Sequence, residues 1–282
     1  MVAYEATTAP AERRRAELGQ FLRARRARLG PEDFGMPPGS RRRTPGLRRE
    51  EVALLAGVGI TWYTWLEQGR EINASIQVLD AVARTLRLEP AERHHLYVLA
   101  EAVPVRVANT GCAAVPDAIS EIVYSLDPLP AIVLNGRFDS LVSNDAYVEL
   151  FRDWHLDPCV HKNGLWCCLT EPTARQKFLE YEAEMRYMVA RMRSVYAQYV
   201  GDPDWEEDIR RLSLLSPHFA DLWSLHEVAD PEPRTRTYLH PVVGPLTFTV
   251  SELAIPASTP ARLIIYTPAD DETRKLLPST RD

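Results

Sequence analysis

Residues 44–70, TPGLRREEVALLAGVGITWYTWLEQGR, constrain the fold more than any other stretch of the chain. A helical rhythm of apolar residues stops at Gly57 and Gly59 and restarts on the segment TWYTWLE. Gly57 can take the left-handed backbone conformation that ends a helix. Ala53 is small enough to let a second helix pack closely against the first. The pattern therefore predicts two short helices joined by a tight turn that contains glycine.

Three more helices are predicted around this pair, because apolar residues recur there at helical spacing. They are ELGQFLRARRARL at residues 17–29, SIQVLDAVARTLRL at 75–88 and EPAERHHLYVLAEA at 89–102. Repeated Gly and Pro in the segment after Leu29 break the first of them. Five short helices predict a compact all-helical domain over residues 11–102.

Charge is distributed unevenly along the chain. The net charge is -6, yet residues 1–89 carry 15 basic residues against 11 acidic ones. Within residues 11–49 the basic residues number 12 and the acidic ones 4. A local excess of this kind indicates a polyanionic partner for the N-terminal part of the chain. A solvated helix face beside a basic loop would give the same excess, so charge alone leaves both interpretations open.

The two helices and their arginine flanks together indicate DNA binding. A helix-turn-helix can place its second helix in the major groove, while flanking arginines bind phosphates on either side. We therefore expect double-stranded DNA as a partner; a helical hairpin without a ligand is the alternative. The residues expected to read bases are Ile60, Thr61, Trp62 and Trp65. Those expected at the DNA backbone are Arg41, Arg42, Arg43, Arg48 and Arg49.

The second half of the chain has a different pattern. We interpret residues 103–114 as a linker and residues 115–270 as a second domain. The segments PAIVLNG and FDSLVSN predict two strands joined at Asn135–Gly136, a strong signal for a hairpin. Residues 173–200 predict one long helix, and the segments RTRTYLHPVV, LTFTVSELAI and RLIIYTP predict three more strands. We therefore expect an α/β domain with a small antiparallel sheet covered by helices.

The predicted helix over residues 173–200 carries methionine and tyrosine side chains on one face. Methionine adapts to irregular cavities, so this face could wall an apolar pocket for a small ligand. The same spacing fits an ordinary packed core, and both interpretations stay open. The candidate lining residues are Tyr181, Met185, Met188, Met192, Phe219, Trp223 and Phe248.

The segment RREEVALLAGVGITWYTWLEQGR resembles the helix-turn-helix of the phage-repressor-like regulators, the XRE family. The longer stretch from LGQFLRARRARLG to AERHHLY is similar to a narrower group, the MmyB-like regulators. The segments PAIVLNGRFDSLVSNDAYVELF, SPHFADLWSLHEV and HPVVGPLTFTVSELAIP carry the same resemblance into the second half. The resemblance implies a bacterial transcription factor with a PAS-like α/β sensing domain, which in this group is associated with fatty-acyl ligands. It also implies three candidates to hold a ligand head group: Arg137, His226 and His240. A structural histidine bonded to the backbone is the alternative for the last two.

Three positions of the helix-turn-helix depart from the pattern of the group it resembles. Relatives usually carry Arg at the position of Trp65 and a smaller residue at that of Trp62. Arg49 stands where the family often has a Gln that contacts DNA. We therefore expect an operator sequence that differs from those of relatives.

Other features exclude several classes of protein. The segment CVHKNGLWCC lacks the paired ligand spacing of a zinc site, so we expect no metal. The chain has no glycine-rich phosphate loop, no nucleophile elbow and no HExxH, which argues against an enzyme. It has no run of 18 apolar residues and no secretory signal, so we expect a cytoplasmic protein associated with the bacterial nucleoid.

These observations predict a ligand-responsive, DNA-binding transcriptional regulator without a cofactor, whose C-terminal domain senses an apolar small molecule, with a fatty-acyl compound as the candidate. One short recognition helix binds weakly, so we expect a homodimer on a palindromic operator. The alternative is a regulator whose C-terminal domain only dimerises or binds a protein partner.

Overall fold

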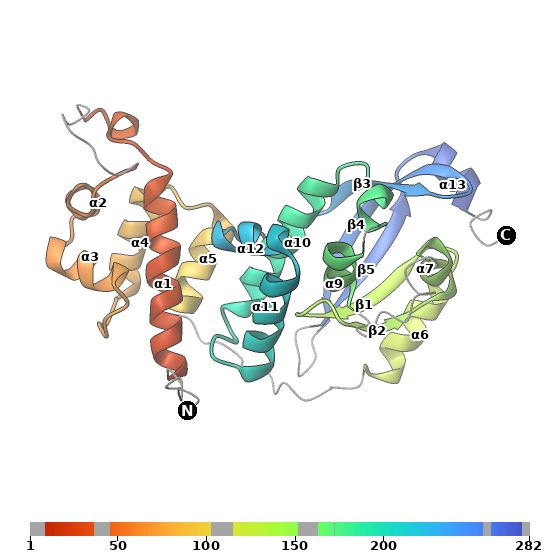
Figure 1. Cartoon of the computed structure of the whole chain (residues 1–282), viewed down its shortest axis with the longest axis horizontal. Helices are drawn as coiled ribbons and strands as arrows, with labels where there is room; N and C mark the ends of the chain where they lie inside the picture. The colour runs from red at the N-terminus through yellow and green to blue at the C-terminus, as the bar shows by residue number, and fades with distance from the viewer. Residues whose placement is uncertain are drawn as a thin grey trace. The chain divides into compact units, whose positions relative to one another are not determined.

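The structure is a computed structural model of the 282-residue chain, and it describes residues 9–36, 46–102, 115–151, 163–171, 173–255 and 261–277. The chain forms two compact units (Figure 1). Unit 1 holds the described residues up to Ala102 together with Arg193–Arg210 and Trp223–Ala229. Unit 2 holds the rest of the described chain. Two segments that the sequence assigned to the second domain therefore fold with the first unit, and the predicted linker lies outside the described residues.

Unit 1 is helical, as predicted. Its helices before residue 103 are α1 (Pro10–Ala27), η1 (Pro31–Phe34), α2 (Arg49–Ala56), α3 (Ile60–Glu67), α4 (Ile76–Thr85) and α5 (Pro90–Leu99). Helix α1 begins earlier than predicted, at Pro10, a residue whose fixed φ suits the first turn.

The predicted glycine turn joins α2 to α3. Gly57 has a φ of 68°, in the left-handed region, and follows the last residue of α2. The amide of Val58 donates a hydrogen bond to the carbonyl oxygen of Ala53, 2.9 Å away. This bond satisfies a carbonyl that the end of the helix would otherwise leave unpaired. Helix α3 then starts at Ile60, so the helix-turn-helix is confirmed.

The core of unit 1 joins helices α1 to α5 through fully buried side chains. They are Phe21, Leu22, Val52, Tyr63, Leu79 and Leu96. Helix α1 approaches α3 very closely at Gly19, where an added Cβ would lie 2.4 Å from the carbonyl oxygen of Glu67. Only glycine therefore permits this spacing between the two helices.

Unit 2 is built on one antiparallel sheet with the strand order β2-β1-β5-β4-β3. The strands are β1 (Ala131–Asn135), β2 (Ser140–Ser143), β3 (Arg234–His240), β4 (Gly244–Ile255) and β5 (Ala261–Pro268). The predicted hairpin and the three predicted C-terminal strands are thus confirmed. The α/β class expected for this half of the chain is confirmed as well.

The described part of unit 2 also contains helices (Figure 1). They are α6 (Asp117–Ser125), α7 (Asp145–Leu150), α9 (Gly164–Thr170), η2 (Ala174–Lys177), α10 (Tyr181–Tyr196), α11 (Pro203–Leu215), α12 (Pro217–Ser224) and α13 (Asp271–Leu276). The end of α10 and parts of α11 and α12 belong to unit 1. None of the helices in the described ranges has both the length and the apolar character needed to cross a membrane.

Successive side chains of a strand point to opposite faces of a sheet, and the two faces of this one carry different partners. Val123 of α6 packs in a buried cluster with Val133 of β1 and Leu263 of β5. The neighbouring residues Ile132 and Arg262 line a cavity instead. One face of the sheet thus supports a packed core and the other supports an open space.

One predicted element was wrong. Residues 173–200 do not form a single helix, because the chain is extended at Phe178 between η2 and α10. Phe178 forms a bridge with Tyr238 of β3, and their rings lie 5.2 Å apart. The amide of Leu179 donates to the carbonyl oxygen of Thr237, 3.1 Å away. These two residues pair with the free edge of the sheet instead of continuing a helix, and α10 therefore begins only at Tyr181.

Candidate nucleic-acid interface and cavity

Helix α3 presents two different faces. Tyr63 and Leu66 point inward and are buried, as predicted. The outer face carries the four residues predicted to read bases: Ile60, Thr61, Trp62 and Trp65. Ile60 and Trp65 are 49% and 40% exposed, although large apolar side chains usually avoid water. The guanidinium of Arg70 lies over the ring of Trp65, 5.8 Å from its centroid. An exposed face of this composition can meet thymine methyl groups in a DNA groove.

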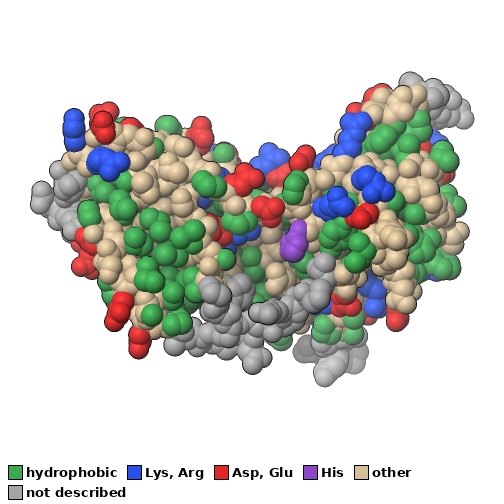
Figure 2. All heavy atoms as spheres, turned by 180° about the vertical axis from the view of Figure 1, so that it is seen from behind, with side chains coloured by type: hydrophobic (Ala, Val, Ile, Leu, Met, Phe, Trp, Pro, Cys, Tyr) green, Lys and Arg blue, Asp and Glu red, His purple; other side chains and the backbone are tan. Residues whose placement is uncertain are grey.

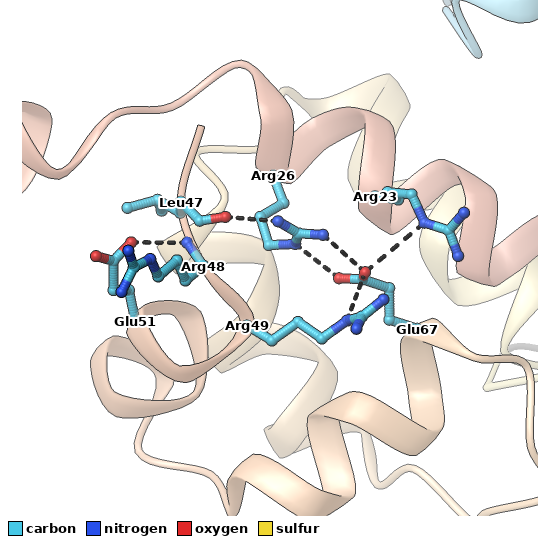
Figure 3. Close-up of polar contacts among 7 residues, drawn as sticks. All are labelled: Arg23, Arg26, Leu47, Arg48, Arg49, Glu51 and Glu67. Atoms are coloured by element: carbon cyan, nitrogen blue, oxygen red, sulfur yellow. Dashed lines mark hydrogen bonds and ion pairs between the residues drawn. The ribbon is translucent and has the colours of Figure 1, made fainter. Parts of the chain in front are cut away.

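Glu67, the last residue of α3, is the centre of a polar cluster (Figure 3). Its side chain is fully buried, and Arg26 of α1 binds both of its oxygens, with distances of 2.7 and 2.8 Å. Arg26 also donates to the carbonyl oxygen of Leu47, 2.5 Å away, and so connects α1 with the segment before α2. Burial acts to raise the pKa of Glu67, but the hydrogen bonds and charges of Arg26 and Arg49 outweigh it and hold the pKa below its usual value. Glu67 is therefore ionised at neutral pH.

Two of the arginines predicted to contact the DNA backbone lie at the start of α2. Arg49 places its Nε 2.9 Å from Oε1 of Glu67 and is 38% exposed. Arg48 is 43% exposed; its amide donates to Glu51, 2.7 Å away, and its guanidinium lies 3.4 Å from Glu50. The other predicted contacts, Arg41, Arg42 and Arg43, lie outside the described residues.

Arg23 of α1 belongs to the same cluster, although sequence reasoning missed it. Its Nε lies 3.8 Å from Oε1 of Glu67, and its side chain is 58% exposed. The signal was its spacing from Arg26, since residues three apart share a helix face. Figure 2 shows further Lys and Arg side chains, in blue, at the surface of the helical unit, on the right in that view. The basic character predicted for the N-terminal part is thus present around the helix-turn-helix.

Two residues predicted to bind a ligand, Trp223 and His226, lie in unit 1. There they surround the fully buried Arg193, whose guanidinium stacks on the Trp223 ring at 3.8 Å and pairs with Glu17 of α1. His226 places its Nδ1 3.3 Å from the same carboxylate. Burial of Glu17 acts to raise its pKa, yet the hydrogen bond to His226 and the charge of Arg193 lower it to about 2. Both predicted ligand residues therefore contribute to a buried ion cluster in unit 1.

Unit 2 contains a cavity of about 430 Å³ between the sheet and helices α7, α9 and α10. Aliphatic and aromatic side chains form most of its wall. They include Ile132, Leu134, Tyr147, Phe151, Phe178, Met188 and Ile264. A volume of this size is within the range of about 300–1,000 Å³ that is usual for small-molecule sites.

Charged side chains gather in one part of this wall. Glu184 of α10 accepts a hydrogen bond from Arg234, 3.0 Å away, and lies 2.9 Å from Arg236. Arg191 of α10 pairs with Glu252 of β4. Charges buried in a mostly apolar cavity are costly unless they are paired, and these four side chains of the wall and Arg234 pair with one another.

Arg262 of β5 has the poorest set of partners in this group. It is 6% exposed, and its Nε lies 3.9 Å from Oε1 of Glu252, beyond hydrogen-bond length. Its buried Nε and Nη2 have no hydrogen-bond partner in the described part of the chain. The guanidinium lies over the Phe138 ring, 4.1 Å from its centroid. Burial lowers the pKa of Arg262 to about 10, so it stays charged at neutral pH.

The lining of the cavity differs from the predicted one, although Met188 belongs to both. Four of the predicted residues are buried in packed core outside the lining: Met185, Met192, Phe219 and Phe248. An α-helix has 3.6 residues per turn, so only one face of α10 lines the cavity. The residues of that face are Glu184, Tyr187, Met188 and Arg191. The sequence prediction missed three of these four residues because it followed the apolar side chains alone.

The remaining predicted ligand residues have local partners elsewhere. Tyr181 donates its hydroxyl to the carbonyl oxygen of Cys168, 2.8 Å away. Arg137 lies 3.4 Å from Asp139, beside the β1–β2 turn. His240 ends β3, and its Nδ1 lies 3.3 Å from the amides of Val242 and Val243. Neither Arg137 nor His240 is among the residues that line the cavity, and a head-group role for them stays a prediction.

The cysteine-rich segment gives no metal site where it can be followed. Cys167 and Cys168 on α9 are buried, and burial raises the pKa of the Cys168 thiol well above its usual value. Cys159 and His161 lie outside the described residues. Within the described ranges, no three His, Cys, Asp or Glu side chains are grouped so that they could hold a metal ion.

Comparison with known families gives two matches. A family model described as a helix-turn-helix domain matches residues 17–96, which contain the exposed face of α3 and the cluster around Glu67. A second model, described as the MmyB-like transcription regulator ligand binding domain, matches residues 115–279, which contain the cavity. A search of curated proteins found no match to the chain. The two matched families are regulator domains rather than enzymes.

Proposed function

We propose a ligand for this chain, which belongs to the family of MmyB-like transcription regulators. Its cavity binds an amphipathic carboxylate of the fatty-acyl class, and this binding changes the affinity of the protein for DNA. DNA binding by the helix-turn-helix and regulation of transcription follow from the family itself. The chemical class of the effector and the residues that hold it are our inference.

The observation that carries this proposal is the buried cation at Arg262. An arginine that leaves its nitrogens without acceptors in a buried site costs several kcal/mol of stability. An anionic group placed in the cavity would accept those hydrogen bonds and offset the cost. The apolar wall beside it, with Leu134, Phe151 and Ile264, suits an acyl chain. A head group and a tail thus each have a matching surface.

At the other site, the exposed face of α3 supports major-groove recognition by Thr61, Trp62 and Trp65. A single helix of eight residues makes few base contacts. We infer a homodimer that reads a palindromic operator, because two half-sites multiply the weak affinity of one helix. Trp65 replaces an arginine that relatives often carry. Apolar contact with thymine methyl groups therefore contributes more to base recognition in this protein.

The ligand proposal is tested with fatty acids and the fatty alcohols of equal chain length. At a hundredfold excess over its dissociation constant, a bound acid stabilises the fold by about 2.7 kcal/mol, which raises the melting temperature. We expect acids to raise the melting temperature of the wild type more than alcohols do. On Arg262→Met we expect acids and alcohols to act equally, because this variant keeps an unbranched side chain but loses the charge. The affinity for DNA is measured in the same conditions.

Two results would contradict the proposal. If acids and alcohols stabilise the wild type equally, Arg262 does not read the head group. If no chain length changes the melting temperature, the cavity holds no acyl ligand. The second result would favour the alternative in which unit 2 only dimerises or binds a protein partner.

A further inference from the structure

Helix α10 contributes residues to both compact units. Its residues up to Met192 belong to unit 2, whereas the segment that starts at Arg193 belongs to unit 1. The residues of α10 that line the cavity are Glu184, Tyr187, Met188 and Arg191. Along this one helix, the last residue of the cavity wall therefore lies only two positions before the first residue of unit 1.

The cavity end of α10 shares a carboxylate with the unpartnered cation of the wall. Arg191 pairs with Glu252 of β4, and Oε1 of the same Glu252 lies 3.9 Å from Nε of Arg262. Charges interact strongly in a buried site, so an anion bound at Arg262 changes the electrostatic balance between Glu252 and Arg191. A ligand in the cavity thus acts on α10 through this pair and through direct packing against Met188.

The other end of α10 is fixed to α1. Arg193 is 1% exposed; it pairs with Glu17 of α1 and donates to the carbonyl oxygen of Trp223. Separating Arg193 from Glu17 would leave a buried charge without its counterpart, which is strongly destabilising. A displacement of this end of α10 therefore carries α1 with it.

Helix α1 in turn meets α3 backbone to backbone. At Gly19 of α1, an added Cβ would lie 2.4 Å from the carbonyl oxygen of Glu67. At Gly69, just after α3, an added Cβ would lie 2.9 Å from the carbonyl oxygen of Arg15. Close-packed contacts of this kind transmit a displacement instead of absorbing it. A shift of α1 therefore also shifts α3 and the exposed face that is expected to read bases.

We propose that α10 and α1 transmit the occupancy of the cavity to α3 and that the Arg193–Glu17 pair is the connection between the two helices. Packed side chains, ion pairs and helices are the elements that carry coupling between distant sites. Each contact on this route lies within one compact unit, and the backbone of α10 joins the two groups of contacts. The inference rests on the proposed function, because it names the route by which the effector changes the affinity for DNA.

The route is tested with a variant that replaces both members of the pair, Glu17→Leu with Arg193→Met. Removing both charges together leaves neither of them buried alone, so we expect the variant to fold. Neither residue lines the cavity, so we also expect it to bind dodecanoate, which calorimetry measures.

The deciding quantity is the ratio of DNA affinities with and without saturating dodecanoate, on a duplex that the wild type selects from a random pool. Coupling between two sites typically changes affinity by about 5–150-fold, and we expect a change in this range for the wild type. We expect dodecanoate to have no effect on the DNA affinity of the double variant.

The matched control is Arg14→Met with Glu101→Gln. Arg14 of α1 pairs with Glu101, which follows α5, so this variant removes an ion pair of α1 that does not involve α10. It should keep the affinity ratio of the wild type, because the connection from α10 to α1 is intact.

Hydrogen exchange of the wild type gives a second measurement that needs no substitution, and it decides the question if the double variant does not fold. Dodecanoate should change the exchange rates of amides in α1 and α3 as well as those in the cavity wall. In the folded double variant, the change should be confined to unit 2.

The outcomes separate the route from the wider function. Equal affinity ratios in the wild type and the double variant would overturn the route and leave the effector proposal intact. Exchange changes that stop within unit 2 of the wild type, while its DNA affinity changes, would do the same. A wild type that binds dodecanoate without any change in DNA affinity would instead contradict the regulatory part of the proposed function and this route with it.

Discussion

Acidification should destabilise this protein through a single histidine. His95 of α5 is 1% exposed, and neither of its ring nitrogens has a hydrogen-bond partner in the described part of the chain. Its ring meets that of Phe21 edge to face, with centroids 4.9 Å apart. Burial is the main reason that the pKa of His95 falls from 6.5 to about 3, and the charges of Arg193 and Arg25 lower it further.

The direction of the effect follows from which state binds the proton. In the unfolded chain His95 takes up a proton below pH 6.5, whereas in the folded chain it stays neutral until about pH 3. Stability is therefore complete above pH 6.5 and is lost as the pH falls toward 3. At pH 5 the pKa of His95 in the unfolded chain, 6.5, lies about 1.5 units above the pH, so the free energy of unfolding is lower by about 2 kcal/mol. The low pKa of Glu17 acts only below about pH 4.5 and does not disturb this window.

Urea unfolding at pH 7 and pH 5 measures this loss, with the variant His95→Leu as the reference. Leucine is uncharged and apolar and suits a site in which the imidazole nitrogens have no partners. We expect the wild type to lose about 2 kcal/mol between the two pH values and the variant to lose almost none. If both proteins lose the same amount, the acid sensitivity arises elsewhere and the argument for His95 is refuted.

Four further outcomes are expected. Gly19→Ala should lower the free energy of unfolding by about 1–3 kcal/mol, because the new methyl group collides with the backbone of α3; urea unfolding measures it. Replacing the arginines at residues 41–43 by alanine should lower the salt slope of DNA binding by about 0.9 for each phosphate that the side chains had neutralised, uniformly across sequences. Thr61→Ala or Trp62→Ala should change which operator is selected from a random pool, and a uniform loss of affinity would contradict base reading. Met188→Trp should fill the cavity and abolish the melting shift caused by fatty acids while DNA binding survives; a variant that is merely destabilised by about 1–3 kcal/mol would identify Met188 as packed core.

The helix-turn-helix could be predicted because its determinants are local. Gly57 ends α2 through its own backbone conformation, and the apolar spacing of α3 places Tyr63 and Leu66 inside. The strands of unit 2 were similarly visible in short runs of β-branched and aromatic residues. By contrast, Phe178 is extended because β3, some 60 residues later, offers it a free sheet edge. The spacing of apolar residues in the local sequence carries no information about a partner so far along the chain.

The polar centres of both sites escaped prediction for a related reason. Glu67 reads as one more solvated charge in the sequence, and its role arises only when α1 brings Arg23 and Arg26 against it. Arg262 lies on the inward side of a buried strand. Its Nε and Nη2 lack hydrogen-bond partners among the described residues only once the cavity is assembled, and a sequence pattern does not reveal this. The predicted anchors Arg137 and His240 were chosen from their segments alone, and each has a local partner instead.

The placement of Arg193 beside Glu17 limits how this protein can recombine with its relatives. A chimera joined within residues 103–114 would inherit Glu17 from one parent and Arg193 with His226 from the other. A parent that lacks either half of this cluster would leave a charge buried without its counterpart, which costs several kcal/mol. The boundary between the two family matches therefore does not coincide with the division into compact units, and we expect exchanges between relatives to keep both halves of the cluster together.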